Sequence, residues 1–342
     1  MLVNLKLKSI AFIKKLYEKR TQHYNCRIEK MIIMRQFTQI IFITFIFICH
    51  SIITVNAQYL SPHDIAALPS LSADTTITYG PDSLNFGELR LPDGLGPHPV
   101  AIVIHGGCWL SIANLHIMDH FCDKLTKAGI ATWNLEYRKV DSPGGGWPGT
   151  FDDIGLGIDY LRILADKYNL DLNRVVFVGH SSGGHLALWA GFRHRVDENS
   201  QLRSENPLRP LGVVSLAGLA DLRDMVERTK AVCGGDVIST LLGGTFEEVP
   251  DHYRNASPLT LLPNGVKQIV IYGSDDPAVP PELGQAYVEA GKLQNENIGF
   301  IVIPDASHFE LIAPWTSSWP IVEASIKSLM FMQNDESSKS AE

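Results

Sequence analysis

From residue 75 onward, short apolar and β-branched runs alternate with longer stretches in which apolar residues recur every three or four positions. Continuous runs of Val and Ile predict buried strands, because a strand covered on both faces has no polar side. The longer stretches have the spacing of amphipathic helices. The predicted strands are 75–79, 86–91, 100–104, 130–135, 175–178, 213–216, 268–272 and 300–303. The predicted helices are 115–128, 148–168, 184–193, 281–293 and 320–332.

Strand followed by helix, repeated along the chain, predicts parallel β-α-β units. The first two strands have no helix between them and are joined by Gly80-Pro81-Asp82, which predicts an antiparallel hairpin. We therefore expect an α/β fold with a mostly parallel sheet of eight strands and helices on both faces. Residues 58–342 are expected to form one domain. The irregular segment 221–263 is expected to be a small cap or a loop excursion over the strand ends.

The N-terminal part has the pattern of an export signal. The apolar run 37–55 follows Met34-Arg35 and ends in Val55-Asn56-Ala57, the layout of a secretory signal peptide at about 34–57. We expect cleavage after Ala57 and a secreted or periplasmic protein. The alternative is an uncleaved segment that anchors the protein to a membrane. The stretch before Met34 is unusually long and basic for such a signal, which predicts a translation start at Met31 or Met34.

The charge of the remaining chain argues against a nucleic-acid partner. Residues 1–57 hold nine Lys and Arg and two Asp and Glu, so 20 basic and 35 acidic side chains remain, a net charge of −15. Such a charge repels phosphate backbones, and no basic patch with interleaved aromatic residues stands out.

Three cysteines remain after residue 57, namely Cys108, Cys122 and Cys233. An odd number argues against a disulfide framework, with one bridge plus a free thiol as the alternative.

The sharpest chemical signal is a hydrophobic strand that runs into Gly179-His180-Ser181-Ser182-Gly183 and then directly into a predicted helix. Gly-x-Ser-x-Gly between a strand and a helix places the serine on a tight turn, where the glycines avoid backbone collisions. Ser181 is therefore the candidate nucleophile, and the adjacent helix N-terminus favours developing negative charge. The alternative is a Gly and Ser turn without chemistry.

A serine nucleophile needs a base, and the base needs an acid to orient it. His308 follows the last predicted strand, so we expect it at the same carboxyl edge of the sheet as Ser181. The preceding strand is followed by Asp275 and Asp276, of which we prefer Asp276 as the acid. Asp275 and Asp221 are the alternatives, and turn capping explains all three as well. The order Ser, Asp, His along the chain is that of α/β-hydrolases.

The third predicted strand leads into His105-Gly106-Gly107-Cys108-Trp109. Its glycines allow backbone NH groups to face the site, so a donor from Gly107 or Cys108 and the NH of Ser182 are candidates for an oxyanion hole. Three aromatic residues fall near the same edge and are candidate walls of a substrate pocket, although core packing explains any single one equally well. These aromatic residues are Trp109, Trp147 and Phe309.

Together, His-Gly-Gly-Cys-Trp, Gly-His-Ser-Ser-Gly-Gly, Gly-Ser-Asp-Asp-Pro-Ala-Val-Pro and Ser-His-Phe-Glu-Leu-Ile resemble the esterase and formamidase branch of the α/β-hydrolase fold. Kynurenine formamidases and feruloyl-esterase-like carboxylesterases of that branch carry His-Gly-Gly-x-Trp. The resemblance spans about residues 75–332. It implies that Ser181, Asp276 and His308 form a catalytic triad and that Gly106 and Gly107 line the oxyanion loop. The sequence departs from the lipase-like His-Gly-Gly-Gly version at Cys108.

The expected function is that of a secreted serine hydrolase without cofactor or metal, acting on a small carboxylic ester. One alternative is an arylformamidase or a hydrolase of small amides or peptides with the same fold. A binding protein of this fold without catalysis is another, and it predicts a broken triad. Membrane association is expected only if the N-terminal segment is retained, and the oligomeric state stays open.

A metal enzyme is a further rival, because residues 116–120 read His-Ile-Met-Asp-His, one residue away from the zinc-binding pattern His-x-x-Glu-His. The shorter Asp119 would have to reach a metal-bound water, and no third ligand is evident in the sequence. A solvated helix face explains these residues better.

Overall fold

The computed structural model describes residues 19–20, 27, 30–31, 34–39 and 59–331. The chain divides into two compact units, residues 1–58 and 59–342. In the first unit, residues 34–39 are helical, and Thr38 Oγ1 donates a hydrogen bond to the carbonyl of Met34 at 2.8 Å. Most of the predicted export segment, including its cleavage site, lies outside the described residues. Within the described ranges, no helix combines the length and apolar character needed to cross a bilayer.

The second unit is built on a sheet of eight strands in the order β1-β2-β4-β3-β5-β6-β7-β8. The pairs β1–β2 and β2–β4 are antiparallel, and all the other pairs are parallel. The predicted mostly parallel sheet with an antiparallel hairpin at its start is confirmed. The strands are β1 Thr75–Thr78, β2 Phe86–Arg90, β3 His98–Ile104, β4 Ala131–Leu135, β5 Leu170–His180, β6 Gly212–Leu216, β7 Lys267–Gly273 and β8 Ile298–Ile303.

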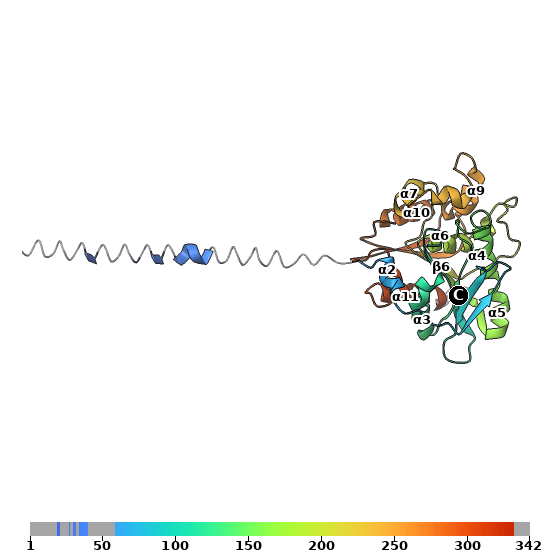
Figure 1. Ribbon diagram of the computed structural model, residues 1–342, viewed down its shortest axis with the longest axis horizontal. Helices are drawn as coiled ribbons and strands as arrows, with labels where there is room; N and C mark the ends of the chain where they lie inside the picture. Colours follow the sequence, from blue (N-terminus) through green and yellow to red (C-terminus); the bar gives the residue numbers. More distant parts are fainter. Residues whose placement is uncertain (1–18, 21–26, 28–29, 32–33, 40–58, 332–342) are drawn as a thin grey trace, which may run out of the picture. The chain divides into compact units, whose positions relative to one another are not determined.

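Helices cover both faces of the sheet. In Figure 1, α3 and α11 lie on one side of the sheet, while α4, α6 and α10 lie on the other. Phe121 of α3 packs edge-on against Trp319 of α11, and Phe151 of α4 packs against Trp189 of α6, with ring centroids 5.3 and 4.8 Å apart. The helices are α3 Asp119–Lys127, α4 Gly149–Asp159, α5 Leu161–Tyr168, α6 Ser182–Gly191, α10 Pro281–Leu293 and α11 Trp319–Phe331.

Two predicted helices differ from the observed ones. The predicted helix 148–168 is two helices, α4 and α5, which meet at Tyr160. Beside the break, the indole NH of Trp133 donates to the carbonyl of Gly157 at 2.9 Å, a carbonyl that an uninterrupted helix offers to Leu161. The predicted helix 115–128 begins with a 3₁₀ turn, η1 Leu115–Met118, before α3. A single apolar stripe in the sequence does not reveal either break.

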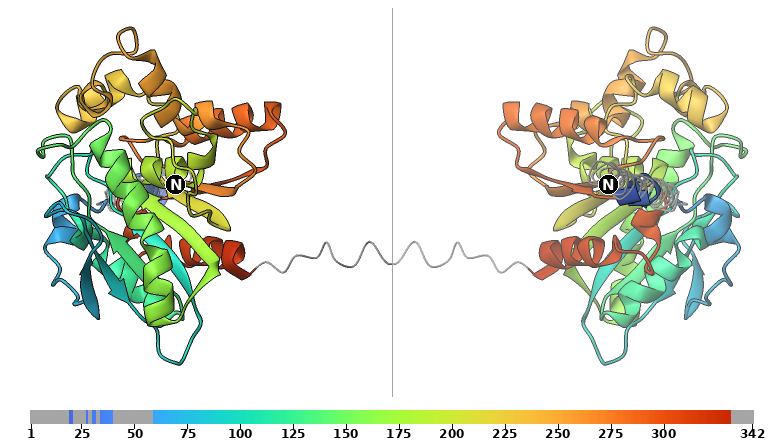
Figure 2. Two further views of the ribbon diagram at one scale, coloured as in Figure 1. Left: turned by 90° about the vertical axis from the view of Figure 1, so that its right-hand side faces the viewer. Right: turned by 90° about the vertical axis from the view of Figure 1, so that its left-hand side faces the viewer.

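The irregular segment 221–263 is mostly helical. It contains α7 Val226–Cys233, α8 Val237–Leu242, α9 Pro250–Ala256 and the 3₁₀ turn η3 Pro258–Leu261. In both views of Figure 2, these gold helices lie together at the top, on the side of orange α10 and away from red α11. The segment therefore consists of short helices and is not a loop excursion. Its expected role as a small cap over the strand ends stays a prediction.

Candidate active site

The strand β5 leads into α6 through a tight turn centred on Ser181. Ser181 has φ 55° and ψ −122°, and its NH donates to the carbonyl of Leu216, the last residue of β6, at 2.8 Å. A Cβ on Gly179 would lie 2.0 Å from the carbonyl oxygen of Gly183, and a Cβ on Gly183 would lie 2.2 Å from the carbonyl oxygen of Ile104. Only glycine fits at these two positions, so the turn itself requires the Gly-x-Ser-x-Gly spacing.

His308 and Asp276 reach the same edge of the sheet from β8 and β7. His308 Nδ1 lies 2.6 Å from Asp276 Oδ2, and the Asp276 side chain is fully buried. The other carboxylate oxygen accepts the backbone NH groups of Ala278 and Val279 at 2.8 and 2.9 Å. A buried carboxylate needs such partners, because an unpaired charge loses its hydration. The turn after β7 therefore fixes Asp276 and leaves one of its oxygens for the imidazole.

The neighbouring acids that the sequence left as alternatives lie elsewhere. Asp275 is exposed, and its Oδ2 accepts a hydrogen bond from the hydroxyl of Tyr59 at 2.7 Å. Asp221 Oδ1 accepts the NH of Arg223 at 3.0 Å, which is a turn-capping contact. Of the three acids, Asp276 is the one that contacts His308.

His180, within the tight turn, contacts the backbone of the loop that carries His308. Its Nε2 lies 3.0 Å from the carbonyl oxygen of His308, and the two imidazole centroids are 4.5 Å apart. Burial and the nearby charge of His308 lower the pKa of His180 well below its usual range. A neutral His180 therefore donates its Nε2 proton to the backbone of the His308 loop. Sequence reasoning missed this role, although the position between Gly179 and Ser181 was its signal.

The loop after β3 approaches the tight turn from the other side. A Cβ on Gly106 would lie 2.7 Å from the carbonyl oxygen of His180 and 3.0 Å from Cβ of Ser181, so this loop touches the turn through bare backbone. Within residues 59–331, the NH groups of Gly106, Gly107, Cys108 and Ser182 donate no hydrogen bond to the protein. Free NH groups beside a candidate nucleophile are what an oxyanion hole requires.

Glu136, directly after β4, holds the start of this loop. Its carboxylate lies 3.1 Å from His105 Nε2, accepts the NH of Leu115 at 3.2 Å and contacts the ammonium of Lys139. Burial opposes ionisation of Glu136, but the hydrogen bond and charge of His105 and the charge of Lys139 outweigh it and lower its pKa to about 2. The hydroxyl of Tyr137 also donates to the carbonyl of His105 at 2.9 Å. Sequence reasoning missed Glu136, whose signal was an acid directly after a buried strand.

Two of the cysteines form a bridge. Cys108 of the loop is disulfide-bonded to Cys233, the last residue of α7, with their Cα atoms 5.9 Å apart. Cys122 is free and buried, and burial raises the pKa of its thiol to about 12. The alternative of one bridge plus a free thiol is the one that the structure shows for these three residues.

A cavity of about 880 Å³ opens between these elements. Residues 60–70, which include α2 (Pro62–Ala66), form one wall of it, and no role was predicted for them. The sequence signal for the short helix in this wall was a capping box, in which the NH of Ser61 donates to the carboxylate of Asp64 at 2.8 Å. The predicted site residues that line the cavity are Gly106, Gly107, Cys108, Trp109, Ser181, Ser182, His308 and Phe309.

Trp147 is not among the residues that line this cavity. Its ring stacks on His252 with centroids 3.9 Å apart, and its indole NH donates to Gln201 Oε1 at 2.9 Å. The prediction that Trp147 walls the substrate pocket is therefore corrected. His252 belongs to α9 (Pro250–Ala256), so Trp147 packs against this helix instead.

The rival metal pattern does contribute to a cluster. His116 and Asp119 gather with Glu88, and one ligand atom from each lies within 4.8 Å of the others. However, Arg90 Nη2 lies 2.9 Å from Asp119 Oδ1 and 3.1 Å from Glu88 Oε2, so a guanidinium already neutralises these carboxylates. His120 Nε2 lies 3.0 Å from the carbonyl oxygen of Pro69, away from the cluster. These residues fit a cation poorly.

A parallel sheet with a serine on the turn after its central strand, and with a histidine and an acid after the last two strands, defines the α/β-hydrolase fold. Comparison with known proteins agrees with this class. A model of the BD-FAE family matches residues 89–290, more than half of the chain, and the chain belongs to this family.

Among individual proteins, esterase LipC from Mycobacterium tuberculosis is 26% identical over 220 residues, which cover 63% of this chain and 54% of that protein. The chain spans about half the length of the curated relatives it matches.

Two solved structures share the fold. A truncated carbohydrate esterase from gut microbiota has a TM-score of 0.63 and 22% identity, with 76% of this chain and 97% of that chain covered. Esterase B from Lactobacillus rhamnosis has a TM-score of 0.65 and 18% identity, with 78% and 91% covered. At these identities, the likeness shows the fold alone.

Proposed function

We propose that this protein is a secreted serine hydrolase that cleaves small carboxylic esters through an acyl-enzyme. The observation that carries the proposal is the 2.6 Å contact between His308 Nδ1 and the buried carboxylate of Asp276, with His308 and Ser181 on the wall of one cavity. Membership of the BD-FAE family and the similarity to a protein named as an esterase support the choice of esters.

In this mechanism, Ser181 Oγ attacks the ester carbonyl carbon while His308 Nε2 takes its proton. The oxyanion that forms accepts hydrogen bonds from the NH of Ser182 and from the loop 106–108. The carbon–oxygen bond to the alcohol then breaks, and His308 returns the proton to the leaving alcohol. Water repeats the sequence on the acyl-enzyme and releases the acid. Asp276 holds the imidazole with its Nδ1 proton toward the carboxylate throughout.

An arylformamidase or small-amide hydrolase uses the same residues in the same order, because the chemistry at the carbonyl is alike. Initial rates over p-nitrophenyl esters of different acyl length, feruloyl esters, acetyl-sugar esters and formyl-aryl amides separate these substrate classes. We expect the esters to be hydrolysed faster than the amides, and the reverse order would make the amide hydrolase the better assignment.

Replacing the nucleophile tests the reaction class. We expect Ser181→Ala to lose labelling by a fluorophosphonate probe and to lower kcat for a p-nitrophenyl ester by up to about a million-fold, because no acyl-enzyme can form. Ser328→Ala, an exposed serine of α11, is the control and should label and turn over like the wild type.

The melting temperature of both variants shows that the fold is intact. A wild-type protein that neither labels nor hydrolyses any ester would point to a non-catalytic binding protein. Labelling that persists in Ser181→Ala would place the nucleophile elsewhere.

The two adjacent acids provide a matched test of the third residue. Asp276→Asn should lower kcat by about 10²–10⁴-fold, because an amide in that buried position no longer stabilises the imidazolium and favours the wrong tautomer. Asp275→Asn removes only the exposed contact with Tyr59 and should leave kcat close to the wild-type value. Steady-state kinetics of both variants decide the assignment, and a larger loss in Asp275→Asn would overturn it.

Secretion is part of the proposal and is supported by the signal-like residues 34–57 and by the Cys108–Cys233 disulfide, which is typical of oxidising compartments. We expect the exported protein to begin at Gln58 after cleavage behind Ala57. N-terminal sequencing of the protein from the medium or periplasm tests this. Recovery of the uncleaved chain in the membrane fraction would support the anchored alternative instead.

A further inference from the structure

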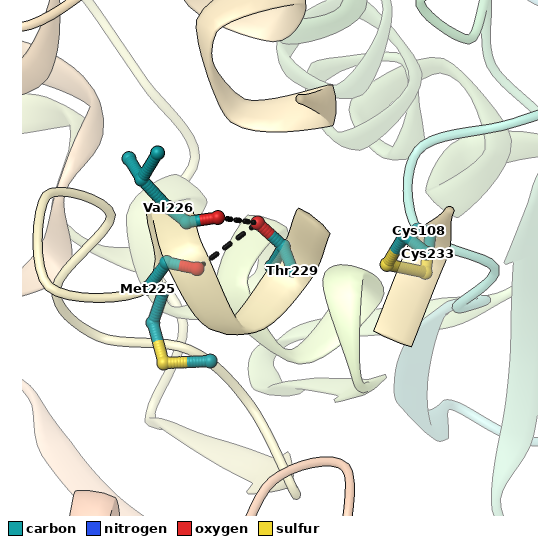
Figure 3. Close-up of a disulfide and its surroundings, with 5 residues drawn as sticks. All are labelled: Cys108, Met225, Val226, Thr229 and Cys233. Carbon is teal, nitrogen blue, oxygen red and sulfur yellow. Dashed lines mark hydrogen bonds between the residues drawn. A yellow bond between two sulfur atoms is a disulfide. The ribbon is translucent and has the colours of Figure 1, made fainter. Parts of the chain in front are cut away.

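The disulfide joins two parts of the cavity that are far apart in the sequence. Cys108 lies on the cavity-lining loop whose NH groups donate no hydrogen bond to the protein within residues 59–331, and Cys233 lies 125 residues later at the end of α7. Figure 3 shows this bond between the loop and the end of the helix. Both cysteines line the cavity, as do Met225 and Thr229 at the start and middle of the same segment. One covalent bond therefore connects the candidate oxyanion loop with a cavity wall.

The α7 wall has side-chain hydrogen bonds within its own helix. The hydroxyl of Thr229 donates back to the carbonyls of Met225 and Val226 at 2.9 and 3.0 Å, as Figure 3 shows. The helix ends at Gly234, whose left-handed φ of 78° turns the chain away directly after Cys233. A bonded turn of helix gives the disulfide a defined anchor on this side.

The loop on the other side of the bond is strained. Gly107, Cys108 and Trp109 have φ values of 120°, 57° and 54°, and the last two residue types rarely adopt this left-handed region. Trp109 is held by burial and by its carbonyl, which accepts the NH of Val140 at 2.9 Å. In contrast, the backbone of Cys108 makes no hydrogen bond to the protein within residues 59–331. The disulfide is thus the bond that ties Cys108 itself to another part of the chain, while its neighbours are held by hydrogen bonds of their own.

We propose that Cys108 and Cys233 are positioning residues, whose disulfide holds the oxyanion loop in its strained conformation and couples it to the α7 wall. This inference rests on the proposed function, because it assigns a catalytic consequence to the loop. Without the bond, Cys108 relaxes toward an ordinary backbone conformation and the adjacent NH groups turn away from the oxyanion. The transition state loses stabilisation, while ground-state binding, which depends on the cavity walls, changes less.

The test is the double variant Cys108→Ser/Cys233→Ser, in which neither thiol is left unpaired. At a temperature well below its melting point, we expect kcat for a p-nitrophenyl ester to fall by about 10–100-fold with a smaller change in KM. The double variant should also bind a trifluoromethyl ketone more weakly by a similar factor, because the serine adds to the ketone carbonyl and forms an oxyanion. The corresponding alcohol, which forms no oxyanion, should bind as before. Cys122→Ala, which removes the free buried thiol, is the control and should keep kcat and both affinities.

If the disulfide only stabilises the fold, its loss lowers the melting temperature of the double variant and leaves kcat and the affinity for the ketone unchanged. That result would overturn the proposal. If the double variant does not fold, dithiothreitol treatment of the wild type replaces it, with thiol titration and near-ultraviolet circular dichroism followed together. We then expect ester hydrolysis to fall as the thiols appear while the fold signal persists. Full activity after complete reduction would overturn the proposal. In contrast, a wild type that hydrolyses no ester refutes the proposed function itself.

A second, independent observation concerns the charge of the cavity. Among the residues that line it, Arg228 is the single Arg or Lys, and none is Asp or Glu. Arg228 is exposed, and its Nη1 donates to the carbonyl of Pro277 at 3.2 Å, with no carboxylate partner among the described residues. The whole chain carries a net charge of −8, and Arg228 is nevertheless a cation without a carboxylate partner in the described part of the chain, at the wall of a cavity that no Asp or Glu lines.

We infer that Arg228 selects esters that carry an anionic group, such as a free carboxylate, in the acid or alcohol part. Like the first inference, this one rests on the proposed function and names a substrate class for the same site. A guanidinium at the cavity wall pairs with a carboxylate through charge-assisted hydrogen bonds. Neutral esters of the same size gain nothing from it.

A pair of substrates with the same acyl chain and the same leaving group but different charge tests this inference: mono-4-nitrophenyl adipate and its methyl ester, with the release of 4-nitrophenol followed for both. We expect the wild type to favour the anionic substrate in kcat/KM, with a preference that weakens as salt is added. Arg228→Gln should lower that preference by about tenfold. Arg223→Gln is the control, since Arg223 stacks on Phe246 at 3.9 Å and is not among the residues that line the cavity, and it should keep the wild-type preference. Equal use of both substrates by the wild type, or an unchanged preference in Arg228→Gln, would overturn the inference.

Discussion

The constraint on which the site depends is the close backbone contact between the ends of β3 and β5. These strands are parallel neighbours, so their carboxyl ends emerge side by side. Positions 106, 179 and 183 have no room for a side chain, because each would collide with a carbonyl oxygen of the adjoining backbone. The turn that presents Ser181 and the loop that presents free NH groups are therefore pressed together. The spacing between them is set by backbone contact and not by adjustable side chains.

Two buried carboxylates, each paired with a histidine, stabilise the two sides of this contact. Asp276 holds His308, and Glu136 holds His105 at the start of the NH-donating loop. A buried carboxylate is costly unless it is paired and hydrogen-bonded. Asp276 meets this requirement with backbone NH groups, while Glu136 meets it with the ammonium of Lys139. Both pairs lie at the carboxyl edge of the sheet, where chain turns supply NH groups that the strands do not need.

Much of this arrangement was predictable from the sequence, because its causes are local. The later strands follow from continuous apolar runs, and the turn at Ser181 follows from glycines that the backbone requires. The sequence favoured Asp276 over Asp275, and in the structure Asp276 contacts His308. The sequence gives little basis for this choice, because two adjacent carboxylates differ only in the direction in which the turn points each side chain. The roles of Glu136 and of the Cys108–Cys233 bridge depend on contacts between distant segments. Trp147 was misplaced for the same reason, since stacking on His252 is not encoded locally.

The residue at position 108 illustrates how the loop balances strain against restraint. A glycine there, as in the lipase-like His-Gly-Gly-Gly version from which this sequence departs, would adopt the left-handed conformation without steric cost. Cys108, at φ 57°, is strained in this conformation, but it also forms a covalent bond to Cys233. Glycine would be unstrained but also free to adopt other conformations, since the backbone of this residue has no hydrogen bond to the protein within residues 59–331. A strained but tethered residue therefore defines the loop more narrowly than an unstrained and untethered one.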